Sequence, residues 1–86
     1  MQFLTRSGCH LCESARPSVL RAARWAGMSV REVDIDTDDE LTRDFGVRIP
    51  VVRIGTAVVA EGTIGAVGLW RRLLAARFGR RISPSG

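Results

Sequence analysis

The two cysteines of the sequence, Cys9 and Cys12, are the side chains with the clearest potential for chemistry. They lie three positions apart, after a short apolar segment and before a stretch with helical periodicity, which is typical of a redox-active pair. A cysteine at the first turn of a helix faces unpaired backbone N–H groups and the positive end of the helix dipole, and both favour the thiolate. We therefore expect Cys9 to have a pKa below that of a free cysteine and to be the nucleophile. Cys12 would then attack a mixed disulfide formed on Cys9.

The elements that would position this pair follow from the spacing of the apolar residues. Residues 1–5 are predicted to form a strand, and residues 10–26 a helix that ends at Gly27. Pro17 falls inside this helix, where a proline removes a backbone hydrogen bond and favours a kink. Alternating apolar residues predict a second strand over residues 29–36, parallel to the first through a right-handed crossover. The residues predicted to form the inner face of the helix are Cys12, Ala15, Val19, Ala22, Ala23 and Ala26.

A second, shorter helix is predicted after this strand. Thr37 and Glu40 fit a capping box, in which each side chain pairs with a backbone N–H group of the other. Leu41 and Phe45 lie four positions apart on the predicted inner face. Gly46 is expected to end the helix in the left-handed conformation.

The remaining sequence predicts a hairpin and a final helix. Residues 47–54 and 57–60 are expected to be strands joined by a turn at Gly55–Thr56. Thr63 is expected to cap a last helix that ends near Phe78. Its predicted inner face consists of Val67, Trp70, Leu74 and Phe78.

This order of elements predicts an α/β fold with a four-stranded mixed sheet and helices on both faces. We expect one domain over residues 1–79 and a flexible C-terminal tail over residues 80–86. Trp25 and Trp70 are interpreted as core or packing residues. No run reaches the roughly 18 apolar residues that span a bilayer, and the N-terminus lacks the features of a signal peptide, so we expect a cytoplasmic protein with no membrane partner.

The charge is unevenly distributed along the chain. The net charge is +4 and all 13 basic residues are arginine. Positive charge gathers late in the chain, at Arg71, Arg72, Arg77, Arg80 and Arg81, whereas acids gather between Glu32 and Asp44. A basic C-terminal helix could contact nucleic acid. The helix dipole also favours cations near that end, so we interpret the arginines as a solvated helix face and expect no nucleic-acid partner.

The order of elements, with the cysteine pair between the first strand and the first helix, resembles the thioredoxin fold in its βαβαββα arrangement. The short length is similar to the glutaredoxin-like branch of that superfamily. Residues 45–52, which contain Pro50, are similar to the segment in which a cis proline opens the third strand beside the active cysteines. Pro17 lies five residues after Cys12, like the kink-forming proline in the active-site helix of many thioredoxins.

This resemblance implies that Cys9 is the attacking thiolate and Cys12 the resolving thiol. It implies a cis bond before Pro50, which would leave the Ile49 backbone free to pair with an extended substrate segment. Arg6 occupies the position where glutaredoxins often have a lysine near the glutathione carboxylate. A protonated His10 would favour the thiolate further, although an exposed histidine with little effect is an equal alternative.

The stretch that corresponds to the glutathione-binding signature departs from the family pattern. Glutaredoxins have a Gly-Gly pair followed by an aspartate, whereas this sequence has Gly62 and Thr63 with no following acid. The Thr63 hydroxyl at a helix N-terminus could still hold a carboxylate. Glutathione or another low-molecular-weight thiol is therefore an open co-substrate.

These residues predict a thiol–disulfide oxidoreductase that acts on protein or small-molecule disulfides. It requires no cofactor and no metal, works as a monomer, and is reduced by a thiol or a flavoprotein. The alternative is a protein that holds a metal or an iron–sulfur cluster with the same cysteines, as a dimer, because one chain supplies too few ligands for structural zinc. A thioredoxin-like interaction module with little turnover is a third reading. Residues 34–45 begin like a calcium loop but lack its glycine and glutamate.

Overall fold

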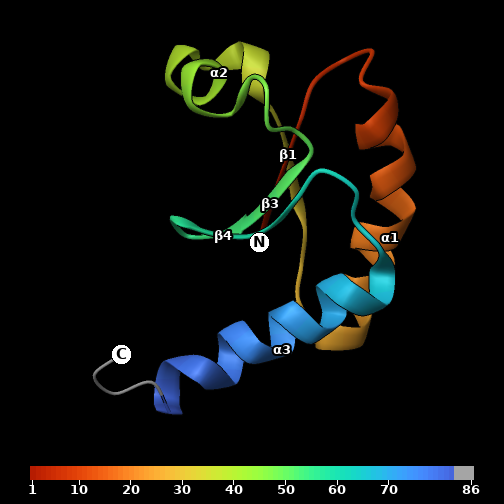
Figure 1. The fold of residues 1–86 in the computed structure, drawn as a ribbon, viewed down its shortest axis with the longest axis vertical. Coiled ribbons are helices and arrows are strands. Elements are labelled where there is room, and N and C mark those ends of the chain that lie inside the picture. Colours follow the sequence, from red (N-terminus) through yellow and green to blue (C-terminus); the bar gives the residue numbers. More distant parts are fainter. Residues whose placement is uncertain (83–86) are drawn as a thin grey trace.

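The computed structural model describes the backbone of residues 1–82 and the side chains of residues 1–76. Its strands and helices follow the order predicted from the sequence, with one additional 3-10 turn (Figure 1). The elements are β1 (Gln2–Thr5), α1 (His10–Ala26), β2 (Arg31–Asp34), the 3-10 turn η1 (Ile35–Thr37), α2 (Asp39–Phe45), β3 (Val51–Ile54), β4 (Ala57–Glu61) and α3 (Ala66–Ile82).

The four strands form one mixed sheet in the order β2-β1-β3-β4. β1 runs parallel to β2, with Leu4 opposite Val33, and antiparallel to β3, with Leu4 opposite Val51. β4 returns antiparallel to β3 after the turn at Gly55–Thr56, where Gly55 has a φ of 61°. The predicted four-stranded mixed sheet and the parallel crossover through the first helix are confirmed.

Alternating side chains of the strands face two separate apolar layers. Phe3 and its partner Val52 pack with buried residues of α1 and α3, whereas Leu4 and its partner Val51 pack with Ile35 and Phe45 near α2. Figure 1 accordingly shows α1 and α3 on one side of the sheet and α2 on the other. Helices on both faces are therefore confirmed.

Helix α1 follows its sequence pattern closely. The six residues predicted for its inner face are all buried, and five of them are alanine or valine, whose small side chains let α1 approach the sheet and α3. The helix ends at Gly27, which has a φ of 68° and donates its N–H to the carbonyls of Ala23 and Arg24. Pro17 lies inside the helix on its exposed side.

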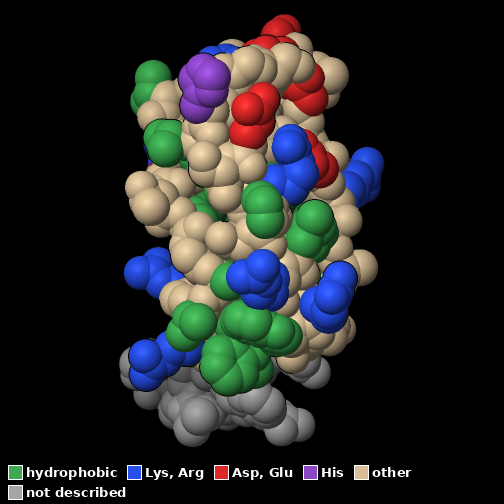
Figure 2. All heavy atoms as spheres, turned by 90° about the vertical axis from the view of Figure 1, so that its right-hand side faces the viewer, with side chains coloured by type: hydrophobic (Ala, Val, Ile, Leu, Met, Phe, Trp, Pro, Cys, Tyr) green, Lys and Arg blue, Asp and Glu red, His purple; other side chains and the backbone are tan. Residues whose placement is uncertain are grey.

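Two tryptophans meet at the far end of α1. Trp25, in the last turn, and Trp70 of α3 have ring centroids 5.9 Å apart and an interplanar angle of 80°, an edge-to-face pair. Trp25 is 48% exposed. Exposed hydrophobic side chains accordingly gather at the lower end of the face in Figure 2. Trp70 also packs against the main buried cluster, so the pair joins the edge of the core to the surface.

The N-terminal cap of α2 lies one residue later than predicted. The Asp38 carboxylate accepts the N–H groups of Glu40 and Leu41 at 2.9 and 3.1 Å, whereas the Thr37 hydroxyl donates to the Asp34 carbonyl at 2.7 Å. Thr37 is therefore part of η1, and the predicted capping box is wrong.

Gly46 was expected to be left-handed, but it has a right-handed φ of −54° and ψ of −34°. Its N–H donates to the Thr42 carbonyl at 2.9 Å. A Cβ atom at this position would lie 2.5 Å from the Thr42 oxygen. Glycine is required here for close backbone approach and not for a positive φ.

Two strands are shorter than predicted. β2 covers Arg31–Asp34, because the chain enters η1 at Ile35, and β3 begins at Val51 instead of residue 47. Residues 46–48 form a turn and Pro50 follows a cis peptide bond, so the chain cannot pair as a strand before Val51.

Helix α3 differs from its prediction at both ends and in its inner face. It begins at Ala66, so Thr63 does not cap it, and it continues to Ile82, past the point where the tail was expected to begin. Residues 83–86 of the predicted tail and the Phe78 side chain lie outside the described structure. Among the described side chains of α3, residues 66–76, Leu69 and Leu73 are fully buried, whereas Val67 is 56% exposed. No helix within residues 1–82 is long and apolar enough to cross a membrane.

Substitution of adjacent leucines tests which face of α3 is buried. Leu73→Ala should lower the free energy of unfolding by about 2–5 kcal/mol, because it removes a side chain with no exposed area. Leu74→Ala should cost clearly less, because Leu74 is partly exposed. Urea titration monitored by circular dichroism measures both. An equal or larger loss for Leu74→Ala would contradict this orientation of the helix.

Two glycine substitutions separate close approach from backbone conformation. Gly46→Ala should destabilise the protein by about 1–3 kcal/mol, because the new Cβ must displace the Thr42 carbonyl. Gly68→Ala is the control: this glycine is in α3 with no atom within 4 Å of a new Cβ, and alanine should stabilise the helix by up to about 1 kcal/mol. The same titration gives both values, and a neutral Gly46→Ala would refute the steric role.

Candidate redox site

The turn before α1 places Cys9 at the N-terminal cap of the helix. Gly8 has a φ of 78°, and the Cys9 N–H donates to the Arg6 carbonyl at 3.3 Å. The Cys9 backbone is extended, its carbonyl accepts the Glu13 N–H at 3.0 Å, and its Sγ accepts the Cys12 N–H at 3.1 Å. The sulfur therefore satisfies one of the donors that a helix leaves unpaired in its first turn.

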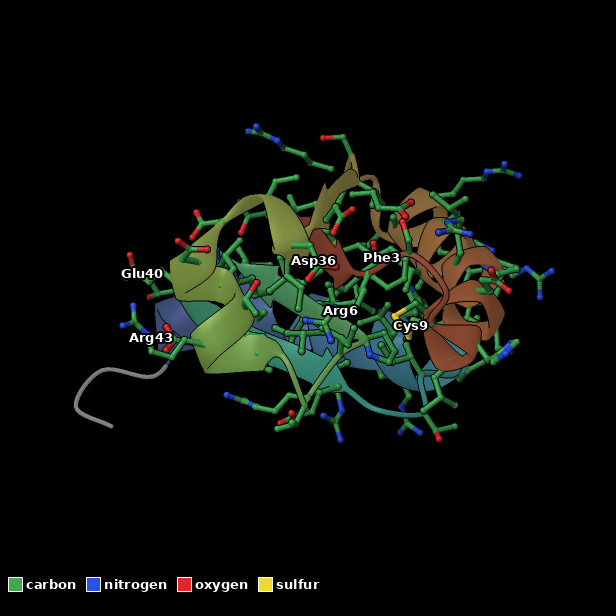
Figure 3. All side chains as sticks on the ribbon, turned by 90° about the horizontal axis from the view of Figure 1, so that it is seen from above. Phe3, Arg6, Cys9, Asp36, Glu40 and Arg43 are labelled. Carbon is green, nitrogen blue, oxygen red and sulfur yellow. A yellow bond between two sulfur atoms is a disulfide. The ribbon has the colours of Figure 1, made fainter. Side chains whose placement is uncertain are left out.

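Cys9 and Cys12 are joined by a disulfide, with 5.2 Å between their Cα atoms. Figure 3 shows this bond at the N-terminal end of α1. Cys12 is 1% exposed, whereas Cys9 is partly exposed. An incoming disulfide can thus reach the Cys9 sulfur more easily than that of Cys12. This is what the predicted roles require, and the roles themselves remain a prediction.

Strand register brings Pro50 and Gly62 to the same end of the sheet as the cysteine loop. The Ile49–Pro50 peptide bond is cis, the form that the thioredoxin resemblance implies. Val51, the first residue of β3, pairs with Leu4 near the end of β1 and with Glu61 at the end of β4. The cysteine loop, Pro50 and Gly62 therefore adjoin the same end of the sheet. The Gly62 N–H donates to the Pro50 carbonyl at 3.0 Å.

The Ile49 backbone is less available than predicted. Its N–H donates to the Phe45 carbonyl at 3.2 Å, which also accepts the Arg48 N–H at 2.9 Å. The prediction of a free Ile49 backbone is therefore wrong for the N–H group. The Ile49 N–H is already hydrogen-bonded within the turn after α2. The Ile49 carbonyl is therefore the backbone group that could pair with an extended segment.

Arg6 lies beside the cysteine loop, but its charge already has a partner. The Nε atom is 3.0 Å from Asp36 Oδ1, and Figure 3 shows the side chain directed toward Asp36. Thr63 is exposed and lies before the first turn of α3, so its hydroxyl is not at the helix N-terminus as predicted. His10 is the exposed first residue of α1, next to Cys9.

Two further ion pairs flank the site, and the sequence alone did not indicate them. Arg16 of α1 binds Glu32 of β2 through two hydrogen bonds, of 3.0 and 2.6 Å, and the Thr5 hydroxyl adds a third bond to Glu32. The hydrogen bond with Arg16 is the main cause that lowers the pKa of Glu32. Acidic and basic side chains accordingly alternate over the upper part of the face in Figure 2.

The second pair joins the loop before β3 to the end of β4. Arg48 binds Glu61 through bonds of 2.9 and 3.2 Å, and this hydrogen bonding is the main cause that lowers the pKa of Glu61. The Arg48 guanidinium also lies 5.0 Å from the Phe45 ring centroid, within cation–π range. The pair connects the segments that contain Pro50 and Gly62. Nothing in the sequence indicates that these two residues meet, because they come together only through the antiparallel pairing of β3 with β4.

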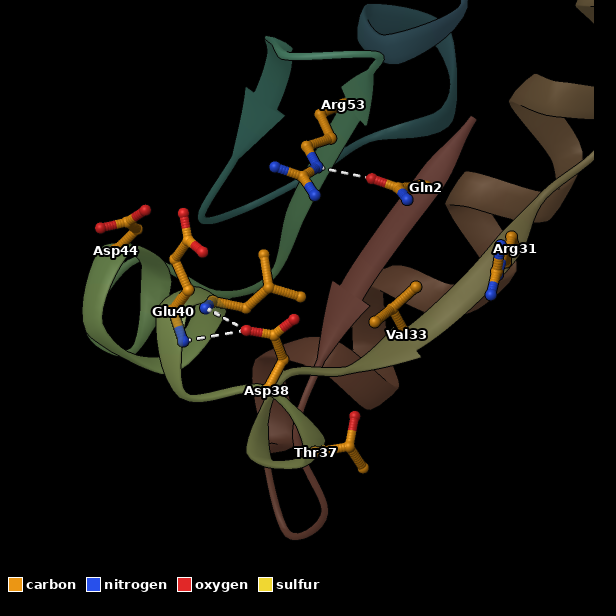
Figure 4. A pocket seen from close by; sticks show the side chains of 9 residues that line it. Gln2, Arg31, Val33, Thr37, Asp38, Glu40, Asp44 and Arg53 are labelled. Atoms are coloured by element: carbon orange, nitrogen blue, oxygen red, sulfur yellow. Dashed lines mark hydrogen bonds between the residues drawn. The ribbon is translucent and has the colours of Figure 1, made fainter.

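A groove of about 470 Å³ lies away from the cysteines, between α2 and the sheet (Figure 4). Its residues come mainly from the strands and from the acidic side of α2, and Arg53 bonds Gln2 across it at 2.5 Å. It contains no residue predicted for the redox site. In the described part of the chain, no three His, Cys, Asp or Glu side chains are grouped closely enough to hold a metal ion.

The β2-β1-β3-β4 sheet, the cysteine pair at the start of α1 and the cis proline before β3 define a thioredoxin-like domain. The model of the Glutaredoxin-like domain (DUF836) family matches residues 1–79, and the chain belongs to this family. No curated protein sequence matches significantly.

Two solved structures are similar to this fold. The structural genomics target XcR50 from X. campestris is 28% identical, with a TM-score of 0.73 over 86% of this chain and 95% of that chain. A structure described as that of a malarial protein is 16% identical, with a TM-score of 0.63 over 85% of this chain and 90% of that chain. The second likeness concerns the fold alone.

The Arg16–Glu32 pair should make stability depend on pH. Because the folded-state pKa of Glu32 is below its ordinary value of 4.5, the pair stabilises the fold above that pH, and the stabilisation disappears as the pH falls through the folded-state pKa. Glu32→Gln should therefore lower the melting temperature at pH 7 by at most a few degrees, since exposed ion pairs contribute little. The difference from wild type should shrink below pH 4.5.

The control is Glu40→Gln, whose carboxylate is exposed on α2 and forms no hydrogen bond within the described residues. Thermal unfolding at pH 3, 5 and 7 compares the three proteins. A Glu32→Gln deficit that stayed constant across this range would show that Glu32 acts through packing rather than through its charge.

Proposed function

We propose that this chain is a thiol–disulfide oxidoreductase with Cys9 as nucleophile and Cys12 as resolving thiol. The observation that carries the proposal is the position of the Cys9 sulfur, which caps α1, accepts the Cys12 N–H and is within bonding reach of Cys12. A backbone donor directed at sulfur stabilises negative charge there, as does the positive end of the helix dipole. Both favour the thiolate, which is the reactive form.

The reaction transfers two electrons to a substrate disulfide. The Cys9 thiolate attacks one substrate sulfur, forms a mixed disulfide and releases the other sulfur as a thiolate, which takes up a proton. Cys12 then loses its proton and attacks Cys9, releasing the second substrate thiol and leaving the Cys9–Cys12 disulfide. The substrate is reduced to two thiols, and the protein is oxidised by the same two electrons.

Residues around the pair position the partner segment. Pro50 and the Ile49 carbonyl lie at the sheet end next to the cysteine loop, where an extended segment can align beside Cys9. The exposed His10, when protonated, adds positive charge beside the Cys9 thiolate. An external thiol or a flavoprotein reductase reopens the disulfide, and no bound cofactor takes part in the cycle. We place this activity in the cytoplasm as a monomer, where a cycling cysteine pair contributes to electron transport and redox homeostasis.

Replacement of the resolving cysteine tests this assignment. Reduced Cys12→Ser protein treated with hydroxyethyl disulfide should retain one thioethanol group on Cys9, because no internal thiol remains to displace it. Intact-mass spectrometry measures the adduct, and peptide mapping locates it. Wild-type protein should instead end as the internal disulfide without an adduct.

The matched control is Cys9→Ser, in which only the buried Cys12 remains and adduct formation should be slower by at least about tenfold. Equal labelling of the two variants would overturn the assigned roles. If neither variant forms an adduct and both only hold less metal than the wild type, a metal-binding function replaces the oxidoreductase.

A further inference from the structure

Two apolar side chains near the cysteines are exposed to solvent. Leu11, between Cys9 and Cys12, is 53% exposed, and Val47, in the turn before Pro50, is 99% exposed. Both are large aliphatic residues in a chain with a limited core, yet neither contributes to either buried cluster. A partner that covered these two side chains would remove apolar surface from water, which would favour its binding.

The Arg6 side chain connects the segments that contain the two residues. Leu11 is in the first turn of α1, directly after the loop that begins at Arg6. Val47 follows Gly46, and a Cβ atom on Gly46 would lie 3.8 Å from the Arg6 guanidinium. Leu11 is thus adjacent to the cysteines, and Val47 is in the turn that the Arg6 side chain reaches, three residues before the cis proline Pro50.

The arginines at this end are already neutralised by carboxylates. Arg6 pairs with Asp36 at 3.0 Å, Arg16 with Glu32 at 2.6 Å, and Arg48 with Glu61 at 2.9 Å. Glutathione disulfide has four carboxylates, and any of them that approached these three arginines would have to compete with an internal partner to gain an ion pair. Exchange of one exposed ion pair for another yields little net affinity.

The helix end that could hold a glutathione carboxylate is also displaced from its expected position. α3 begins at Ala66, and the exposed Thr63 hydroxyl lies ahead of its first turn. Arg72, further along α3, donates to the Val59 carbonyl at 3.1 Å. The surroundings of Cys9 therefore combine exposed apolar groups with charges that are paired internally.

Given the proposed oxidoreductase activity, we infer that the preferred substrate is a protein disulfide in an extended apolar segment, and that Leu11 and Val47 are its specificity-determining contacts. Residues beside the substrate cysteine cover these two side chains while the Cys9 thiolate attacks the substrate sulfur. The electrons come from the Cys9–Cys12 dithiol, and the displaced substrate sulfur leaves as a thiol.

Single-turnover kinetics with pre-reduced protein test this inference without any recycling reductant. Four probes are compared: a peptide disulfide flanked by Val and Leu, the same peptide flanked by Asp, glutathione disulfide, and the small neutral hydroxyethyl disulfide. Acid quenching and mass spectrometry give each second-order rate constant. The apolar peptide should react at least about tenfold faster than glutathione disulfide and the Asp-flanked peptide.

Leu11→Ser and Val47→Ser should each lower the ratio of the apolar-peptide rate to the hydroxyethyl disulfide rate by roughly three- to tenfold. The matched controls are Leu20→Ser, more than two turns further along α1 and 49% exposed, and Val58→Ser, near the hairpin turn and 36% exposed. Both controls should keep the wild-type ratio. The ratio isolates the flanking contacts from any change in the reactivity of Cys9.

Three outcomes would overturn the inference. Equal rates for glutathione disulfide and the apolar peptide would do so, and so would an unchanged ratio in Leu11→Ser and Val47→Ser. In both cases hydroxyethyl disulfide is still reduced, so the oxidoreductase proposal survives. If the wild-type protein reduces none of the four probes, the proposed function itself fails and the inference fails with it.

Discussion

The hydrogen bond from the Cys12 N–H to the Cys9 sulfur is the interaction on which the site depends. The Cys9 side chain is thereby both the N-terminal cap of α1 and the nucleophile that we propose. The geometry needs a buried β1 to anchor the loop, a glycine with positive φ at position 8 to turn the chain, and an apolar face on α1 to fix the helix axis. Local folding and chemistry are therefore specified by the same few residues.

Three arginine–carboxylate pairs hold the surrounding segments in place. Arg6 joins the cysteine loop to η1, Arg16 joins α1 to β2, and Arg48 joins the loop before β3 to β4. Each pair is exposed and individually weak. Together they link the segments that leave the sheet at the end where the cysteine loop lies. In each pair a carboxylate offsets the positive charge of the arginine. Although the chain has a net charge of +4, these three arginines are therefore each paired with a carboxylate.

Much of the fold, the position of the cysteines at the start of α1 and the cis bond before Pro50 could be predicted from the sequence. The inner face of α1 was predicted correctly because its alanines and Val19 recur at helical spacing on one side. The cysteines, Pro50 and Gly62 were singled out by their residue types. The predicted inner face of α3 was wrong because apolar residues occur on several sides of this helix, and their spacing does not select one side. Thr37 and Asp38 are adjacent capping residues, and only the 3-10 turn that uses Thr37 decides between them.

The ion pairs and the engaged Ile49 N–H could not be predicted, because they depend on how separate elements are placed in space. Arg16 and Glu32 are distant in the sequence and meet only through the parallel pairing of β1 with β2. The Ile49 N–H is hydrogen-bonded to the Phe45 carbonyl, in a turn where the sequence pattern predicts a strand. Sequence periodicity describes each element by itself and contains no information on such contacts.

The edge-to-face tryptophan pair has a practical consequence for work in solution. Trp25 is 16 residues along the chain from Cys9, a separation of about 24 Å on a helix, which is beyond contact quenching by a sulfur atom. Its emission should follow the docking of α1 on α3 and be insensitive to whether the cysteines are oxidised. Tryptophan fluorescence can therefore report the folding of this protein independently of the redox state of its cysteines.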